Sequence, residues 1–132
     1  MLDYREKMGK GFSLLKRIKS FKHAINGLCL LIKEEHNSRI HLLAAILAIT
    51  AGYYFDISTA EWLMIVIAIG AVFGAELLNS AIENIADAVT EEHHPKIKKA
   101  KDLAAGAVLV VSIMAFVIGM IIFIPKLYNL DY

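Results

Sequence analysis

The sequence predicts an all-α membrane protein, with three transmembrane helices preceded by an amphipathic surface helix. Of its 132 residues, 58% are hydrophobic and 20% are charged, whereas soluble domains average about 45–50% apolar and about 25% charged residues. Three long apolar stretches follow one another, and basic residues gather in only two of the segments outside them. We therefore expect one integral membrane domain over residues 1–132.

The first predicted element is an amphipathic helix over about residues 12–35. Its apolar residues recur at steps of three and four with lysines between them, which is typical of a helix that lies on a membrane surface. A soluble helix that packs on a partner would show the same pattern, but here a membrane span follows at once. The apolar residues are Phe12, Leu15, Ile18, Phe21, Ile25 and Leu28.

The three predicted membrane spans cover about residues 38–55, 60–89 and 101–125. A helix needs about 20 residues to cross a hydrocarbon core of about 30 Å. The third stretch meets this length without a charge from residue 103 onward. The second meets it only if polar residues of its C-terminal half lie within or near the membrane, and the first is short.

Residues that favour helix ends separate these spans. Ser58 or Thr59 is placed to cap the second span, with Glu61 in its first turn. Pro95 suits a break between the second and third spans, and Pro125 suits the end of the third.

Basic residues predict the orientation. Nine of the 14 Lys and Arg residues precede the first apolar stretch, which begins at Ile40, and four lie at positions 96, 98, 99 and 101. The positive-inside rule then places the N-terminus and the second connection in the cytoplasm and the C-terminus outside. The 14 basic residues barely exceed the 13 acidic ones, so the charge balance argues against a nucleic-acid partner.

The second span carries an acidic stripe, which we define as Glu76, Asn79, Glu83 and Asp87. At 100° per residue these four positions fall within an arc of about 80°. Ionisable groups at membrane depth are costly and usually face a bundle interior or a polar cavity. The stripe therefore predicts a polar functional site, with interhelical hydrogen bonds near the water interface as the structural alternative.

Two other polar points are expected at the same membrane face. Lys101 and Asp102 stand at the start of the third span, where a lysine can neutralise phosphate charge, although Asp102 could instead cap the helix. Glu34 and Glu35 lie between the surface helix and the first span.

This set of residues suits magnesium-dependent phosphoryl transfer. Magnesium is typically held by one or two carboxylates together with substrate phosphates, a role that Glu35 and Glu83 could serve. Glu76 lies deeper and could accept a proton from a lipid hydroxyl. Phosphoryl transfer needs mainly positioning and charge neutralisation, so a metal, a lysine and a base suffice in principle.

The residues alone are also compatible with two other classes of protein. The acidic stripe could line an ion or proton pathway, although such a pathway has no need of Lys101 and Asp102. A non-enzymatic helical assembly subunit could pack through Gly70 and Gly74, which are one helical turn apart, but it would give the carboxylates no role.

Three segments carry a resemblance to a known family. They are ELLNSAIENIADAV at 76–89, KKAKDLAAGAVLV at 98–110, and KEEHN at 33–37 followed by IH at 40–41. They are similar to the E-x-x-N-[TS]-A-I-E-x-x-x-D, A-K-D-x-x-[AS]-A-A-V and E-R-N…I-H patterns of the prokaryotic diacylglycerol kinases, which are small integral membrane lipid kinases. His36 stands where the Gram-positive branch usually has Arg.

The resemblance implies a homotrimer that uses ATP and magnesium. By matched position it implies Glu76 as the general base and Glu35 and Glu83 as metal ligands, with Asn79 supporting the active site. His93 replaces the Tyr of the family's E-Y-H nucleotide contact. The implied ATP-binding residues are Lys16, His23, Glu35, Glu83, Glu92, His93, His94, Lys101 and Asp102.

The resemblance also suggests the substrate. The Gram-positive branch, which this chain resembles in its E-x-N…I-H and E-E-H-H-P segments, phosphorylates undecaprenol. We therefore expect an undecaprenol kinase at the cytoplasmic membrane face, with a diacylglycerol kinase that makes phosphatidic acid as the alternative. A subunit with three spans has little room to enclose both a nucleotide and a lipid, so we also expect a site shared between subunits.

Overall fold

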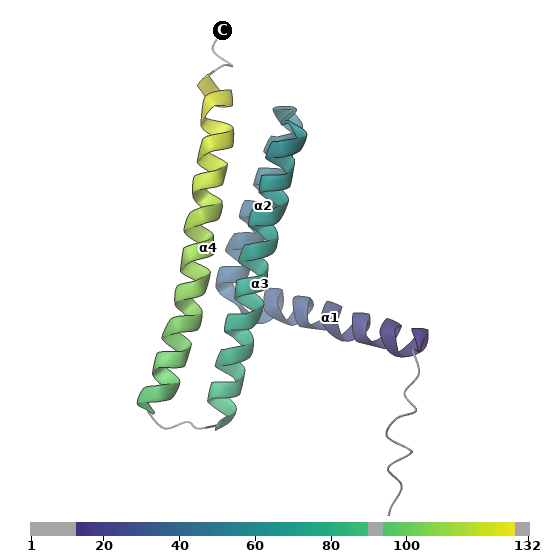
Figure 1. The fold of residues 1–132 in the computed structure, drawn as a ribbon, viewed down its shortest axis with the longest axis vertical. Coiled ribbons are helices and arrows are strands. Elements are labelled where there is room, and N and C mark those ends of the chain that lie inside the picture. Colours follow the sequence, from purple (N-terminus) through teal and green to yellow (C-terminus); the bar gives the residue numbers. More distant parts are fainter. Residues whose placement is uncertain (1–12, 90–93, 129–132) are drawn as a thin grey trace, which may run out of the picture.

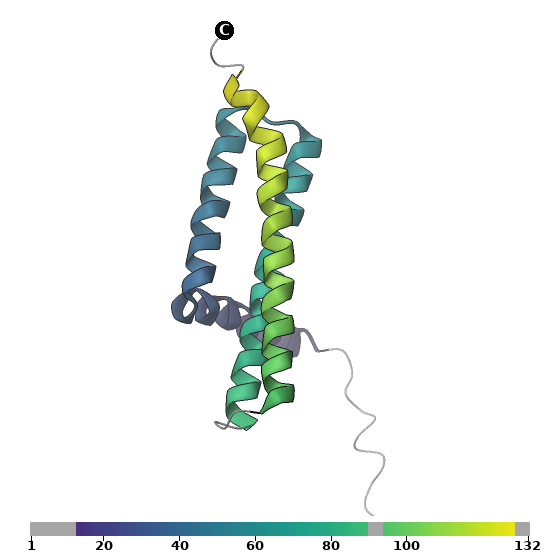
Figure 2. The same ribbon diagram turned by 90° about the vertical axis from the view of Figure 1, so that its left-hand side faces the viewer.

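Four α-helices make up the computed structural model, which describes residues 13–89 and 94–128 (Figure 1). The all-α fold class is confirmed. Three of the helices stand side by side as an elongated bundle, and the first projects from its side (Figures 1 and 2). In chain order the helices are α1 (Leu14–Glu34), α2 (His36–Tyr54), α3 (Thr59–Val89) and α4 (Pro95–Tyr128).

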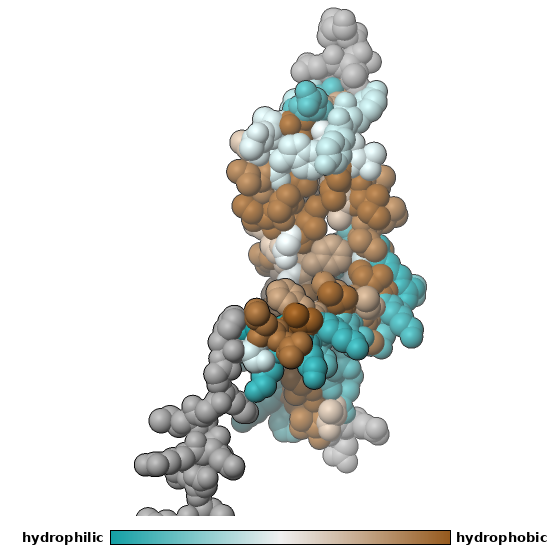
Figure 3. Space-filling view, turned by 90° about the vertical axis from the view of Figure 1, so that its right-hand side faces the viewer, coloured by the Kyte–Doolittle hydropathy of each residue, from teal (hydrophilic) through white to brown (hydrophobic). Residues whose placement is uncertain are grey.

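Two helices, α3 and α4, are long and apolar enough to cross a membrane. Their 31 and 34 residues correspond to about 46 and about 51 Å of helix, which exceeds a hydrocarbon core of about 30 Å. Hydrophobic side chains gather over the middle of the bundle, and hydrophilic ones concentrate near α1 (Figure 3). The 19-residue α2 is less apolar because its first turn contains His36, Asn37 and Arg39.

The surface of α1 keeps its apolar side chains uncovered. Ile18 and Phe21 are 64% and 70% exposed, whereas Leu31 near the C-terminal end is buried. The helix therefore packs on the bundle through its last turns only. This uncovered apolar stripe is what the predicted surface helix requires, and its placement on a membrane stays a prediction.

A single extended residue, Glu35, separates α1 from α2. The guanidinium of Arg39 folds back and donates hydrogen bonds to the carbonyl oxygens of Ile32, at 2.9 Å, and Lys33. These carbonyls belong to the last turn of α1, where no partner exists within the helix. The contact fixes the sharp turn that directs Glu35 toward α3.

At the opposite end of the bundle, α3 begins with a capping box. The Ser58 backbone N–H donates to Glu61 Oε2 at 2.7 Å, and the Glu61 N–H donates to Ser58 Oγ at 3.3 Å. This arrangement satisfies donors that the first turn cannot pair internally. Lys126 Nζ lies 3.0 Å from Glu61 Oε1 and ties α4 to the same turn. The predicted cap at Ser58 is thus confirmed.

The ends of α4 differ from those predicted. The helix begins at Pro95, six residues before the expected start at 101, because proline is well accommodated in a first helical turn. The prediction that Pro125 ends the helix is wrong, since α4 continues to Tyr128. A proline removes its own hydrogen bond to the carbonyl four residues earlier and crowds that carbonyl, but the ion pair of Lys126 ties the turn that follows to α3.

The expected close packing at Gly70 and Gly74 is not made within the described chain. A Cβ atom built at either position would meet nothing within 4 Å. The close approach occurs instead at Gly52, where a Cβ atom would lie 2.7 Å from the Trp62 ring. Nearby, Ile57, Ile65 and Ile122 form a buried cluster.

Candidate active site

The deepest member of the acidic stripe is Glu76, which is only 3% exposed. Two α2 side chains face its carboxylate: Ser38 Oγ donates to Oε2 at 3.3 Å, and His41 Nε2 lies 3.2 Å from Oε1. Burial of a carboxylate is costly unless polar partners offset the loss of water. The start of α2 therefore supplies the polar surroundings that allow this group inside the bundle.

One oxygen of Glu76 keeps an open acceptor position. The His41 ring approaches Oε1 at ion-pair distance but is not aligned for a hydrogen bond, so this buried oxygen has no hydrogen-bond donor. A buried acceptor without a donor is costly. It is also what a general base needs where a substrate hydroxyl is to be received.

One turn further along α3, a second polar group forms around Asn79. Its Nδ2 donates to Glu83 Oε1 at 3.2 Å, whereas its Oδ1 is buried without a donor. On the same helix Ser80 Oγ donates to Glu35 Oε1 at 3.2 Å. Because residues three apart are neighbours on a helix, the structure brings Glu35 to the turn of α3 that carries Glu83.

These oxygens fit a magnesium ion in their chemistry. No cluster of three or more His, Cys, Asp and Glu side chains occurs among residues 13–89 and 94–128. Magnesium, however, is commonly bound by one or two carboxylates plus substrate phosphates. Glu35 and Glu83 supply two carboxylates on neighbouring elements, and Asn79 Oδ1 is a buried oxygen that still lacks a donor.

The last residue of the stripe connects α3 to α4. Lys101 Nζ donates to Asp87 Oδ1 at 2.9 Å. Asp102 points elsewhere and accepts from Lys98 Nζ at 2.6 Å within α4. Since α4 begins at Pro95, Asp102 lies inside the helix and the alternative that it caps α4 is wrong. Lys101 is thus held on the side of α4 that faces the stripe.

Two of the remaining predicted ATP-binding residues, both on α1, lie apart from this cluster. Lys16 and His23 are exposed on α1, about 28 and about 18 Å along the helix from Glu35. Glu92 and His93 lie outside the described residues. His94 immediately precedes α4, and its Nδ1 accepts a hydrogen bond from the backbone N–H of Lys96 at 3.3 Å.

Three contributors to the site were missed by sequence reasoning: Ser38, His41 and Ser80. His41 gave a usable signal, because it interrupts the apolar stretch 40–55 and a polar residue at that depth calls for a partner. Ser38 and Ser80 gave none, because serine is common at helix surfaces and their partners are 38 and 45 residues away in sequence.

An apolar helical bundle with one buried carboxylate, two half-buried ones and a facing lysine is the arrangement expected of a membrane enzyme that handles a charged group beside lipid. The chain belongs to the prokaryotic diacylglycerol kinase family, whose sequence model matches residues 22–123. The predicted class, an ATP-dependent lipid kinase, is confirmed. This result favours the enzyme over an ion or proton pathway.

Individual relatives carry two different names. The chain is 41% identical to the undecaprenol kinase of Bacillus subtilis, over 95% of this chain and 97% of that protein. It is 33% identical to a diacylglycerol kinase of Synechocystis, over 84% of this chain and 64% of that protein. It is 31% identical to the diacylglycerol kinase of Escherichia coli K12, over 57% of this chain and 62% of that protein.

Proposed function

We propose that this enzyme transfers the γ-phosphate of ATP to the hydroxyl of undecaprenol at the cytoplasmic membrane face, giving undecaprenyl phosphate. The similarity to the Bacillus subtilis undecaprenol kinase supports this substrate. The sequence identity of 41% is higher than the 33% to the Synechocystis diacylglycerol kinase, and the match covers nearly the full length of both chains. Diacylglycerol is the alternative substrate, after the names of the more distant relatives.

The observation that carries the mechanism is the buried Glu76 Oε1 that has no hydrogen-bond donor. In the proposed reaction this oxygen accepts the proton of the lipid hydroxyl. The alcohol oxygen then forms a bond to the γ-phosphorus, and ADP leaves with the electrons of the broken P–O bond. Ser38 and His41 hold the carboxylate in place from α2.

In the proposed mechanism, two positive groups neutralise the charge on the ATP phosphates: a magnesium ion and a lysine. Glu35 and Glu83, with Asn79, would hold magnesium, which neutralises phosphate charge when bound. Lys101 would provide a positive charge from α4, and its present partner Asp87 keeps the ammonium on that side. Asp102 and the α1 residues Lys16 and His23, together with residues 92–94, complete the proposed nucleotide contacts.

We also propose the assembly and the topology. The enzyme is a multi-pass protein of the cell membrane, with α2 as a third span, the N-terminus and site in the cytoplasm and the C-terminus outside. Three copies form a homotrimer with sites shared between subunits. The distance between Lys16 on α1 and the acidic stripe supports sharing, because one chain does not bring them together.

A side-by-side assay with undecaprenol and diacylglycerol tests the proposal. The purified enzyme in bilayer discs should phosphorylate undecaprenol faster, and only with ATP and magnesium. Glu76→Gln should abolish turnover and preserve folding, because it removes the charge and keeps the shape. Glu61→Gln, the same change at the other end of α3, is the matched control and should stay active. Turnover by Glu76→Gln would exclude Glu76 as the base, and faster use of diacylglycerol would overturn the substrate.

A further inference from the structure

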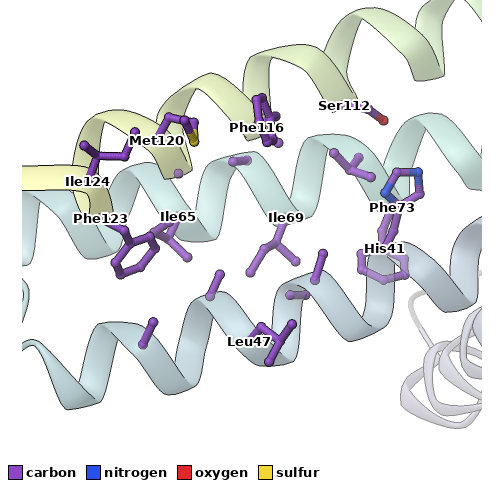
Figure 4. Close-up of a pocket in the computed structure, with 18 of the residues that line it drawn as sticks. His41, Leu47, Ile65, Ile69, Phe73, Ser112, Phe116, Met120, Phe123 and Ile124 are labelled. Carbon is purple, nitrogen blue, oxygen red and sulfur yellow. The ribbon is translucent and has the colours of Figure 1, made fainter. Parts of the chain in front are cut away.

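An apolar cavity of about 650 Å³ lies between α2, α3 and α4 (Figure 4). Its volume is in the range of small-molecule binding sites, about 300–1,000 Å³. Small side chains of two facing helices leave this space open, namely Ala44, Ala48 and Ala51 on α2 and Ala115 and Gly119 on α4. A Cβ atom built at Gly119 would meet nothing within 4 Å. We call this cavity the α2–α4 groove.

The α2–α4 groove runs along the length of the bundle. Its lining on α2 begins at His41 and continues through Ala51 to Phe55 just after the helix, a length of about 21 Å at the rise of an α-helix. That length is well over half of a hydrocarbon core of about 30 Å. The α3 side chains Ile65, Ile69 and Val72 form its apolar floor.

Polar groups occur at one end of the groove. His41 lines that end, and its ring is the neighbour of Glu76 Oε1. Ser112 Oγ also lines the groove and is buried without a hydrogen-bond partner. The groove thus reaches His41, the neighbour of the proposed general base, although Glu76 itself does not line it. This combination is complementary to a molecule with one hydroxyl head and one long apolar chain.

We infer that the α2–α4 groove binds the hydrocarbon chain of the lipid alcohol substrate, with the hydroxyl at Glu76 and the first isoprene units along α2 and α4. This inference rests on the proposed function and adds to it a source of specificity. A single groove receives a single chain, so it favours a polyprenol over a glycerol lipid with two acyl chains. Selection occurs at the groove because the base and the phosphate contacts are the same for either alcohol.

A helix of a second copy is the other conceivable occupant, and the polar end argues against it. An apolar helix seated in the groove would cover the His41 ring and bring no polar group to it, and unpaired buried polar groups are costly. A lipid alcohol brings a hydroxyl to that end. The two occupants predict different results in the experiments below.

Photolabelling tests the occupant directly and needs no turnover. The full-length enzyme in bilayer discs would be irradiated with a polyprenol that carries a diazirine in its second isoprene unit, and labelled peptides would be mapped. We expect label on the α2 and α4 residues of the groove, and loss of label with excess undecaprenol. Label confined to the outer surface, as at Leu63 and Ile67, would overturn the inference.

Filling the groove tests its role in specificity. Ala115→Leu and Gly119→Leu should raise the KM for undecaprenol about tenfold or more, with little change for an alcohol of one or two isoprene units that reaches only the polar end. Ala60→Leu places the same side chain on the exposed start of α3, outside the groove, and should leave both values unchanged. Equal loss for long and short alcohols would contradict the inference.

The oligomeric state of each variant separates the two occupants. If Ala115→Leu or Gly119→Leu changes the oligomeric state and leaves chain-length preference intact, the groove is a contact between subunits and the inference is wrong. Failure of the parent enzyme to phosphorylate any lipid alcohol would instead overturn the proposed function. In that case photolabelling would still show whether a polyprenol chain occupies the groove.

Discussion

At the scale of single residues, the burial of Glu76 is possible because α2 provides Ser38 and His41 to its carboxylate. The spacing of the acidic stripe predicts that Glu76 is important, since a charge in an apolar span needs a reason. It does not predict which groups surround that charge. Those contacts join residues 35 or more positions apart, and they arise only when α2 packs on α3.

His41 is predicted to act as a positioning residue for Glu76. His41→Leu should lower kcat about 100-fold, the scale of a base displaced by about 1 Å, and should leave the KM for ATP nearly unchanged. His41→Gln keeps a polar group near Oε1 and should recover part of the rate. Steady-state kinetics with both substrates measures the two effects.

Thr50→Val is the control on the same helix, because Thr50 is exposed and bonds only to the Ile46 carbonyl. It should match the parent enzyme. A role for His41 in packing alone would lower the thermal stability of His41→Leu and leave the kcat of the folded fraction intact. That result would contradict the prediction.

At the scale of whole helices, α3 and α4 are joined near both ends by ion pairs, Glu61 with Lys126 and Asp87 with Lys101. That these segments form helices was predictable, because a continuous apolar run of about 20 residues can pair all its backbone groups within itself in lipid only as a helix. The residues at which the helices begin and end were harder to predict. The lysines after Pro95 look like a polar connection in sequence, yet they continue as helix, with Lys98 paired to Asp102 one turn later.

The capping box at the start of α3 is predicted to stabilise the bundle independently of catalysis. Ser58→Ala removes the acceptor of the Glu61 N–H and should lower the free energy of unfolding by about 1 kcal/mol. Ser13→Ala is a close control, because Ser13 occupies the same cap position of α1 but makes no side-chain cap hydrogen bond.

Thermal unfolding in detergent, followed by the loss of helical signal, measures both variants. Ser58→Ala should unfold at lower temperature than the parent, and Ser13→Ala should not. Turnover below the transition should be the same in all three proteins, since the cap lies at the end of the bundle opposite the site. Equal unfolding temperatures for the two variants would show that the cap contributes nothing.

At the scale of the whole molecule, one chain leaves apolar surfaces uncovered and its proposed site unfinished. The apolar side chains of α1, such as Ile18 and Phe21, stay largely exposed. A Cβ atom built at Gly70 would meet nothing within 4 Å among the described residues. In the proposed membrane trimer, lipid and other copies of the chain would cover such surfaces. Sequence spacing identifies small residues suited to helix packing, but it does not say whether the partner helix belongs to the same subunit. In this structure the packing predicted at Gly70 and Gly74 is not internal.

The proposed sharing of sites leads to a subunit-mixing prediction. Lys16 lies about 28 Å along α1 from Glu35, whereas Glu35, Glu76 and Glu83 are all arranged around one chain's α3. If Lys16 contacts the nucleotide, it therefore does so in a neighbour's site. Lys16→Ala and Glu76→Gln should each be nearly inactive alone. Trimers that contain both variants should regain activity in about a third of their sites, since in any such trimer one site of the three receives an intact contribution of each kind.

Differently tagged subunits, purified in two steps, would ensure that both variants are present in each assembly. Glu76→Gln mixed with a second tagged copy of itself is the control and should stay inactive. Glu76→Gln mixed with Glu83→Gln should also show no recovery, because both carboxylates lie on the same helix and serve the same site. Suppose instead that Glu76→Gln mixed with Glu83→Gln regains activity and Lys16→Ala mixed with Glu76→Gln does not. Glu76 and Glu83 of one chain would then serve different sites, and α1 would serve the site of its own chain.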